Sequence, residues 1–559
     1  MEKKGIAIGV DNFLKIRTSN AYYVDKSLLI EKIINSPSEV MVFTRPRRFG
    51  KTLNISMLAY YFDILQKEVA WAFEDLEINK TSSKFAAFQN QYPVIKLTLK
   101  DVESSNFENA LGKFKYFMST EYRRHSYLLD SEALDGEQKD YIGKMITQKG
   151  NQKECEVSLR RLSEFLYAHY GKQVLVLIDE YDVPLEKAHF AKVSYYEEMV
   201  DFMRAFYSAL KTNDALYKTV ITGCLRVAKE SIFTGLNNLE IISILSGEGA
   251  EYFGFTDGEV QEMLAYYGLE EKFEEAKAWY NGYEFGNATV YNPWSVINYV
   301  KDMRGNFPFP RPHWSNTSSN SIIKSLIRKA TPQVRTEIEQ LLQKGTLKKP
   351  IREEVVYGEI EKSMDNLWSF LFLTGYLKKV SQEQREEEIL LELAVPNREL
   401  KYIYDTQISD WFEEVVLRET NFEKLYAAIR KGDAQALETE LVIHMGDSIS
   451  YLDHYENFYH GFVAGILKGM PDCLVLSNRE SGYGRSDIFI KEKVPSQRAL
   501  ILEIKVAKSF LELEETAREA LRQVEEKDYE QDLLYHGYVE IEKYGVAFFK
   551  KRCKVVKGL

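Results

Sequence analysis

The stretch Val40-Met-Val-Phe-Thr-Arg-Pro-Arg-Arg-Phe-Gly-Lys-Thr52 decides the fold of the first half of this chain. An apolar strand runs into Gly50-Lys51-Thr52, and the helix-like residues 53–62 follow at once. This layout is typical of a phosphate-binding loop, in which backbone N–H groups at a helix N-terminus surround phosphate oxygens. In such a loop Lys51 reaches the β- and γ-phosphates, and the Thr52 hydroxyl is a ligand for Mg²⁺.

The loop departs from the general pattern G-x-x-x-x-G-K-[ST] at one position, where Arg45 replaces the first glycine. It is also strongly basic, because Arg47 and Arg48 follow closely. Such charges suit the phosphates of a nucleotide or of a polynucleotide, and a solvated basic turn is the alternative. The candidate ATP-binding residues of the loop are Arg45, Pro46, Arg47, Arg48, Phe49, Gly50, Lys51 and Thr52.

A second motif supports this interpretation, the run Val174-Leu-Val-Leu-Ile-Asp179-Glu180. It is an apolar strand that ends in two adjacent carboxylates. In a parallel sheet such a strand is central, and its carboxyl end lies beside the phosphate loop. We expect Asp179 to hold Mg²⁺ and Glu180 to polarise the attacking water, a division of roles found in P-loop ATPases. An ordinary strand followed by two solvated acids is the alternative.

A third expected strand, residues 219–223, ends at Thr222 and is followed by Arg226. In an ATPase of this layout, a polar group at this point senses the γ-phosphate or places the water, so both residues join the candidate ATP-binding set. Each residue also has a structural alternative. The Thr222 hydroxyl could bond only to the backbone, and Arg226 could be a surface charge.

Composition narrows the class of protein. A chain of 559 residues that is 45% hydrophobic has room for roughly three or four domains. No apolar run approaches the ~18 residues of a membrane helix, and no signal-peptide pattern opens the chain, so we expect a soluble, cytoplasmic protein with no membrane partner. The four cysteines are far apart in sequence, which excludes C-x-x-C zinc spacing and a dense disulfide framework. The net charge of −11 argues against a uniformly basic nucleic-acid-binding surface but is compatible with a local basic groove.

Strand and helix patterns alternate through the first 250 residues, which predicts an α/β domain with crossover helices. Residues 94–99 alternate as a strand, and residues 158–170 have the pattern of the helix before the Asp179 strand. From about residue 251 the sequence becomes helix-rich, and a hairpin is expected between 376 and 395.

A second chemical site is predicted near the C-terminus. Asp487 stands at the start of one apolar strand, and Glu503 and Lys505 lie on the next. The period of two places Glu503 and Lys505 on one face, and a hairpin would bring Asp487 beside them. Two carboxylates in that arrangement hold Mg²⁺ or Mn²⁺, and the metal activates water against a phosphodiester. Lys505 would position that water or stabilise the charge of the phosphate. A hairpin with a solvated charged face is the alternative.

Three further side chains are weaker candidates for this second site. Glu456, in a helix-like segment, is a candidate metal ligand, and an exposed helical glutamate is the alternative. Gln523 and Lys527 lie on a later helix that we expect from about residue 513 to 529.

Together these motifs resemble the bacterial AAA-ATPase-like proteins that carry a C-terminal PD-(D/E)XK nuclease-superfamily domain. The resemblance covers almost the whole chain, and an arginine-rich loop is itself typical of that family. Ser486 stands where the superfamily motif has proline. The matching segments are Arg45–Thr52, Ile178–Asp182, Thr222-Gly223, Ser231–Asn238, Tyr291–Pro293, Gly484–Asp487 and Glu503–Lys505.

The resemblance implies an α/β fold class: a P-loop NTPase parallel sheet with a helical lid, followed by a small α/β restriction-endonuclease-like domain. We assign residues 1–250 to the ATPase core, 251–400 to the lid or connecting domain, and 401–559 to the nuclease-like domain. Asp487, Glu503 and Lys505 match the charged nuclease positions residue by residue.

Two functions of different classes follow from these motifs. The first is an ATP-binding and ATP-hydrolysing nuclease that uses ATP and Mg²⁺, with Mn²⁺ as an option at the nuclease site, and that acts on DNA rather than RNA. A role in phage defence or mobile-element biology is an analogy only. The second is a nucleotide-dependent switch or scaffold whose nuclease fold binds nucleic acid or a protein without cutting. Intact Asp487, Glu503 and Lys505 favour the first, and homo-oligomer formation is left open.

Overall fold

The computed structural model divides the chain into two compact units, residues 1–317 with 348–400 and residues 318–347 with 401–559. For residues 361, 362, 364, 446–448, 456–458, 477–481, 484–487 and 532 only the backbone is described. The described residues are 3–81, 83–226, 232–233, 238–305, 308–314, 334, 337–338, 341–342, 345–355, 357–385, 388–404, 406, 422–448, 456–481, 484–492, 498–526 and 530–558.

The first unit is built on a five-stranded sheet of order β2-β3-β4-β1-β5, in which every neighbouring pair is parallel. Every residue of β1 and β3 is buried, as expected for strands covered on both faces. The parallel α/β sheet expected from the sequence is therefore confirmed. The strands are β1 (Val40–Thr44), β2 (Val94–Thr98), β3 (Val174–Asp179), β4 (Leu216–Gly223) and β5 (Leu239–Ile242).

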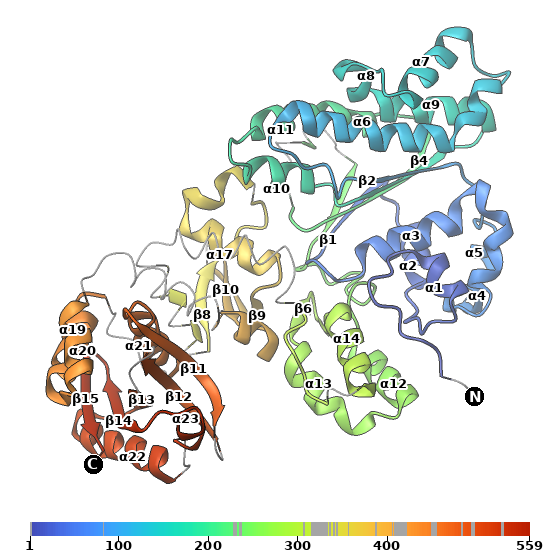
Figure 1. Cartoon of the computed structure of the whole chain (residues 1–559). Coiled ribbons are helices and arrows are strands. Elements are labelled where there is room, and N and C mark those ends of the chain that lie inside the picture. The colour runs from blue at the N-terminus through green and yellow to red at the C-terminus, as the bar shows by residue number, and fades with distance from the viewer. Residues whose placement is uncertain are drawn as a thin grey trace. The chain divides into compact units, whose positions relative to one another are not determined.

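Helices lie on both sides of this sheet (Figure 1). On one side α3 (Lys51–Phe62) packs against β3 and β4, and on the other α6 (Phe107–Arg124) and α9 (Ser158–Tyr170) pack against β2 and β3. The other helices of this part are α1 (Phe13–Thr18), α2 (Leu28–Asn35), η1 (Ile64–Phe73), α4 (Glu77–Thr81), α5 (Ser83–Ala86), η2 (Ser126–Asp130), α7 (Gly136–Ile146), α8 (Gln152–Glu156), α10 (Val183–His189), α11 (Tyr196–Tyr207) and η3 (Ser208–Leu210).

Residues 251–400 were expected to be helix-rich, and the structure adds two small sheets to the helices. The expected hairpin is present, because β9 and β10 pair antiparallel. In the sheets β6 pairs with β7, and β8, β10 and β9 lie side by side. The division of the chain at residues 250 and 400 stays a prediction. The elements are α12 (Asp257–Tyr267), η4 (Glu270–Lys272), α13 (Phe273–Tyr280), β6 (Tyr283–Phe285), β7 (Ala288–Val290), α14 (Pro293–Arg304), β8 (Leu347–Pro350), η5 (Tyr357–Lys362), α17 (Met364–Leu373), β9 (Lys378–Arg385) and β10 (Glu388–Ala394).

The second unit contains a mixed sheet of order β11-β12-β13-β14-β15, in which only β13 and β14 are parallel. Its strands are β11 (Cys473–Ser481), β12 (Gly484–Glu492), β13 (Arg498–Val506), β14 (Glu540–Phe549) and β15 (Arg552–Lys557). Its helices are α19 (Glu423–Lys431), α20 (Ala434–Ser448), α21 (Glu456–Lys468), η6 (Phe510–Glu512), α22 (Leu513–Glu526) and α23 (Gln531–Tyr535).

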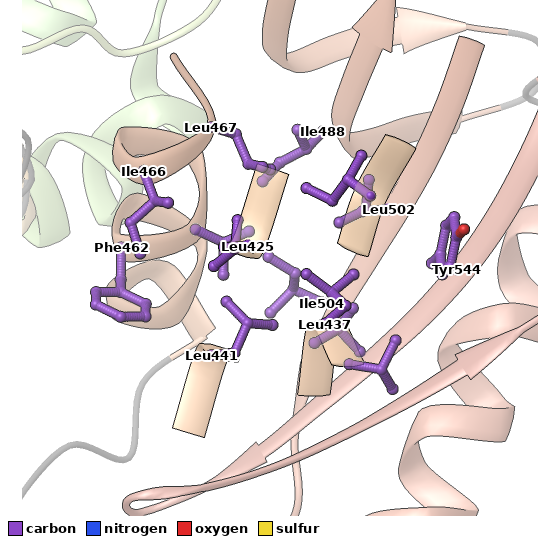
Figure 2. Close-up of a cluster of buried hydrophobic side chains, with 14 of the residues drawn as sticks. Leu425, Leu437, Leu441, Phe462, Ile466, Leu467, Ile488, Leu502, Ile504 and Tyr544 are labelled. Atoms are coloured by element: carbon purple, nitrogen blue, oxygen red, sulfur yellow. The ribbon is translucent and has the colours of Figure 1, made fainter. Parts of the chain in front are cut away.

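The core of this second unit fixes which face of the sheet carries the charged residues. Ile488, Leu502 and Ile504 pack with residues of α19, α20 and α21 in the cluster of Figure 2. Because side chains alternate along a strand, Glu503 and Lys505 point to the opposite face, which α22 covers. Within the described residues, no helix has the length and apolar character needed to cross a membrane.

Candidate functional sites

The Asp179 carboxylate joins three elements at the carboxyl edge of the parallel sheet. The Thr52 hydroxyl on α3 donates to Oδ2 of Asp179 at 2.7 Å, and the Thr222 hydroxyl on β4 donates to Oδ1 at 2.6 Å. The Asp179 side chain is buried. The Thr222 hydroxyl therefore has a carboxylate partner, and the alternative of a purely backbone partner does not describe it. A carboxylate flanked by two hydroxyls is an oxygen-only group of the kind that Mg²⁺ prefers.

Lys51 lies inside the phosphate loop. Its Nζ donates to the backbone oxygens of Arg45 at 2.9 Å and Pro46 at 2.8 Å, and it lies 3.6 Å from Sγ of Cys224. Gly50 caps α3 with φ of 80°, a left-handed conformation that favours glycine. The loop thus holds a buried ammonium at the N-terminus of a helix, where an anion is stabilised.

Glu180 has an unusual backbone and an unusual environment. Its φ is 54°, a left-handed conformation that carries strain for a residue with a side chain. Burial raises the pKa of Glu180, and the nearby Lys51 ammonium opposes that rise. A strained and desolvated carboxyl at a strand end is typical of a group that exchanges protons in a reaction.

Arg45 is buried in the core beside the loop. Its Nη1 donates to the backbone oxygens of Thr44 and Ile242, at 2.9 and 2.8 Å. The guanidinium also lies 5.3 Å from the ring centre of Phe253 and 5.1 Å from that of Phe285. Burial lowers the pKa of Arg45 to about 9, which leaves it mainly charged at neutral pH. These contacts are all with the core, and a contact of Arg45 with ATP stays a prediction.

The other residues of the basic loop also contact protein groups. Arg47 donates to both carboxylate oxygens of Glu186 at 2.6 Å, and Arg48 lies 4.2 Å from the ring centre of Trp294. Phe49 is buried, with its ring against those of Tyr283 and Phe285. A Cβ placed on Gly375 would lie 2.9 Å from Cβ of Pro46, so glycine permits this approach. A solvated basic turn therefore does not describe the loop, which contacts Glu186, Phe253, Tyr283, Phe285, Trp294 and Gly375.

Arg226 is partly buried, and its guanidinium pairs with Glu354 at 2.6 Å and Glu353 at 3.4 Å. The alternative of an unpaired surface charge therefore does not describe Arg226, because two glutamates pair with it. Its role as a phosphate sensor stays a prediction.

Asp182, two residues after Glu180, had no predicted role. Its Oδ2 accepts hydrogen bonds from the backbone N–H groups of Cys224 and Leu225 and from the Tyr357 hydroxyl, each at 3.0 Å. These bonds fix the loop that leaves β4. The signal in the sequence was the third acidic residue of Ile178-Asp-Glu-Tyr-Asp182.

A pocket beside the loop could not be read from the sequence. Its walls are mostly apolar and include Val10, Tyr23, Gly50, Asn54 and Phe255. Apolar walls with a few polar groups are typical of a small-molecule site.

Of the C-terminal candidates, the structure describes the side chains of Glu503, Lys505 and Gln523 and the backbone of Asp487. In the β12–β13 hairpin the ladder runs to the pair Ile488 and Leu502, and Asp487 and Glu503 are the next residues of the two strands. The side chain of Asp487 lies outside the described residues. Glu503 is buried, and Nε2 of Gln523 donates to its Oε1. Lys505 Nζ pairs with Glu519 at 2.7 Å.

The close approach of α22 explains the position of Gln523. Glu503 is the register partner of Gly545 on β14, and a Cβ on Gly545 would lie 2.1 Å from the backbone oxygen of Ala517. Only glycine allows the helix to lie so near the sheet at this point, and that approach brings Gln523 to Glu503.

The two remaining C-terminal candidates are only partly described. Glu456 begins α21, but its side chain and all of Lys527 lie outside the described residues. Tyr459, one turn later, donates to the backbone oxygen of Lys550 at 2.9 Å and stacks on Phe548. No group of three or more His, Cys, Asp or Glu residues that could hold a metal occurs among the described side chains, which leave out Asp487 and Glu456.

Comparison with known proteins agrees with this arrangement. Residues 7–233 match the family of predicted AAA-ATPases, and residues 454–558 match the PD-(D/E)XK nuclease superfamily. An "uncharacterized protein in vnfD 5′region" of Azotobacter chroococcum mcd 1 is 27% identical over 574 residues, which covers 100% of this chain and 98% of that protein. The chain therefore combines an AAA-ATPase-like domain with a C-terminal domain of the PD-(D/E)XK nuclease superfamily.

Proposed function

We propose that this protein is an ATP-dependent nuclease in which the first site binds and hydrolyses ATP and the second cleaves nucleic acid. The observation that carries the ATPase part is the meeting of Thr52, Asp179 and Thr222 beside Lys51. A bound Mg²⁺, held by Thr52 and Asp179 with the phosphates, would neutralise charge that develops during phosphoryl transfer.

The surrounding residues of this chain supply the other parts of ATP hydrolysis. Lys51 binds the β- and γ-phosphates together with the backbone N–H groups of the loop. Glu180 accepts a proton from the attacking water, a role that its raised pKa and its position next to Asp179 support. The pocket beside Gly50 and Asn54 accommodates the nucleoside part of ATP.

For the second site we propose that Asp487 and Glu503 hold Mg²⁺ or Mn²⁺, with Glu456 as a further ligand. Gln523 orients the Glu503 carboxylate, and Lys505 stabilises negative charge on the phosphate once it leaves Glu519. The metal, when bound, supplies an activated water for attack on the phosphodiester. We propose DNA as the substrate rather than RNA, and control of cleavage by the nucleotide state of the first site. A cytoplasmic location and a role in defence or mobile-element biology belong to the same proposal, the latter by analogy only.

One observation favours the second candidate function, a switch or scaffold that does not cut. Glu503 is only 4% exposed, and Lys505 is engaged by Glu519. A site closed in this way would bind nucleic acid or a protein through its surface and leave the phosphodiester intact.

The deciding experiment incubates the purified full-length protein with linear, nicked, supercoiled and single-stranded DNA and with RNA. Each substrate is tested with Mg²⁺ or Mn²⁺, with and without ATP, and ATP hydrolysis is followed in parallel. We expect metal-dependent cleavage of at least one DNA form, at a rate that ATP changes. ATP turnover without cleavage of any substrate would select the switch function.

A further inference from the structure

Two large apolar side chains are exposed next to the predicted nuclease residues. Phe510 is 59% exposed and Leu511 is 91% exposed, and both belong to η6, which follows β13. They lie five and six residues after Lys505 in the sequence. Adjacent exposed apolar side chains of this size in a protein without a membrane helix among its described residues are candidates for contact with a partner.

Basic side chains lie at the same end of the sheet, just beyond the last residues of β13 and β14. β13 and β14 are parallel, with Val506 opposite Phe548, and the N–H of Ala507 donates to the backbone oxygen of Phe548 at 2.9 Å. The segment after β13 carries Lys508, the turn after β14 carries Lys550, and Arg552 begins β15; all three are exposed.

The two segments also share one apolar cluster. Phe549 and Val556, on either side of the basic turn, pack against Ala507 and Leu513, on either side of η6. We call Lys508, Phe510, Leu511, Lys550 and Arg552 the edge surface.

The charges near the edge surface leave it positive. Glu514 and Glu515, at the start of α22, pair with Arg518 and Arg522 on the same helix. Glu512 accepts a hydrogen bond from the Ser509 hydroxyl and keeps its negative charge, so one carboxylate stands against the three cations of the edge surface. Among the described residues, no ion pair within 4.0 Å involves Lys508, Lys550 or Arg552, so these cations stand beside apolar side chains in a protein whose net charge is −11.

We propose that the edge surface binds duplex DNA, with Lys508, Lys550 and Arg552 on the phosphates and Phe510 and Leu511 inserted as a wedge at a base step. Apolar wedges flanked by cations part base pairs in this way, and the cations supply affinity that depends on salt. The proposal rests on the proposed nuclease function for the kind of partner. It adds the place where the duplex is held and distorted, which is formed by residues two to five positions beyond the end of β13 and by the start of the β14–β15 turn and of β15.

The test measures binding of the full-length protein to a short fluorescein-labelled DNA duplex by anisotropy, with Ca²⁺ in place of Mg²⁺. The double variant Lys550→Ala/Arg552→Ala is expected to lower the slope of log K against log salt by about 2, since each phosphate contact contributes roughly 0.9. The double variant Phe510→Ser/Leu511→Ser is expected to bind about tenfold more weakly, with the slope unchanged. A merely structural defect would not separate the two effects in this way.

The opposite end of the same two strands offers matched controls. β13 and β14 begin there, with Arg498 opposite Glu540, and the Arg498 guanidinium donates to the backbone oxygen of Arg430. Lys431 follows Arg430, and Leu534 and Tyr535 precede β14 with exposures of 53% and 89%. Lys431→Ala and Leu534→Ser/Tyr535→Ser should bind DNA as the wild type does.

A second readout isolates the wedge. A duplex with one central mismatch is already partly unstacked, so the wild type should bind it more tightly than the perfect duplex. This preference should disappear in Phe510→Ser/Leu511→Ser and persist in Lys550→Ala/Arg552→Ala.

Several outcomes overturn the proposal without touching the nuclease assignment. Edge variants that bind both duplexes like the wild type, or control variants that lose as much affinity, would show that DNA is held elsewhere. A wild-type protein that binds no duplex would also reject it, and binding of a protein through this surface would then be the function to test. The nuclease assignment fails on a different result, namely cleavage that survives in Asp487→Asn.

Discussion

The two candidate sites differ in the sequence separation of the residues that form them. Thr52 and Asp179 are 127 positions apart, and Asp179 and Thr222 are 43 apart, yet hydrogen bonds join all three. At the C-terminal site Glu503 and Lys505 are two positions apart on one strand, and Gln523 comes from the next long helix. The first site depends on the topology of a parallel sheet, and the second on a hairpin and one crossover.

The sites also differ in what engages their key cation. Lys51 donates to two carbonyls of its own loop, whereas Lys505 pairs with the Glu519 carboxylate of α22. Phosphate oxygens can take over from weakly basic carbonyls more easily than from a carboxylate, because the ion pair must first be broken. In the proposed ATP site Lys51 can therefore meet a phosphate in its present position, whereas in the proposed nuclease site Lys505 must first leave Glu519.

The largest effect is expected for Asp487→Asn, which should abolish DNA cleavage and leave ATP hydrolysis intact. Asp487→Asn should lower DNA cleavage more than ~100-fold, since even outer-shell partners of metal sites contribute 10- to 100-fold. ATP turnover should stay near the wild-type rate, because the residues of the ATP site belong to the other compact unit. Cleavage and ATP hydrolysis are measured on the same preparation. Asp472→Asn, a change at an exposed aspartate before β11, is the control, and equal loss of both activities in Asp487→Asn would contradict independent sites.

Glu180→Gln should divide ATP binding from ATP hydrolysis. We expect unchanged affinity for ATP and a fall in turnover of ~100-fold or more, the usual contribution of a general base. The pKa of Glu180 is raised by burial, and a base must be deprotonated to act. The wild-type rate should therefore fall as the pH drops through a pKa above the ordinary 4.5 of glutamate.

Steady-state rates across pH, with calorimetric binding at each end, check this expectation. Glu198→Gln on the exposed face of α11 serves as the control. An undiminished rate in Glu180→Gln would transfer the role to Thr222 or Arg226.

Lys51→Ala tests the phosphate loop alone. Loss of a charged hydrogen bond to phosphate should weaken ATP binding by about 1.5–3 kcal/mol, or roughly 10- to 150-fold. Binding of duplex DNA in the absence of nucleotide should not change. Isothermal calorimetry compares the variant with Lys149→Ala, which alters an exposed lysine far along the sequence from the loop. Equal ATP affinity in both variants would remove Lys51 from the site.

The smallest effect is expected for Thr222→Val. This change removes the 2.6 Å hydrogen bond to Asp179 while it keeps the shape of the side chain. A hydrogen bond to a carboxylate contributes about 1.5–3 kcal/mol, but Asp179 keeps the Thr52 hydroxyl as a second donor, so we expect a two- to tenfold loss of ATP turnover. Thr222→Ser retains the hydroxyl and should restore the rate. If both variants behave alike, the hydroxyl plays no part.

Most of the fold could be predicted because it rests on local patterns. Continuous apolar runs indicated β1 and β3, alternation indicated β2, and the expected helix at 158–170 agrees with α9. The hairpin of β12 and β13 followed from two apolar runs of similar length. The segment 251–400 was harder, because short strands such as β6 and β7 have only three residues each and leave little periodicity to detect.

The sites could be predicted only as sets of residue types. The motifs named Lys51, Thr52, Asp179 and Glu503, since their spacing follows from strand and helix geometry. The sequence was silent on Asp182 and on the pocket, because their partners come from distant segments such as Tyr357 and Phe255. The basic loop shows the same limit, since nothing local indicates that Arg47 faces Glu186.

The sequence alone was enough to predict the two domain families, because Gly50-Lys51-Thr52, Asp179-Glu180 and Glu503-Ile-Lys505 each need only a few neighbouring residues to be recognised. The partners of the charged side chains, in contrast, became known only from the tertiary structure. It buried Arg45 between aromatic rings and engaged Lys505 with Glu519. The physical reason is that hydrophobic periodicity fixes an element and its faces, whereas the partner of a charge depends on which distant segment packs against that face.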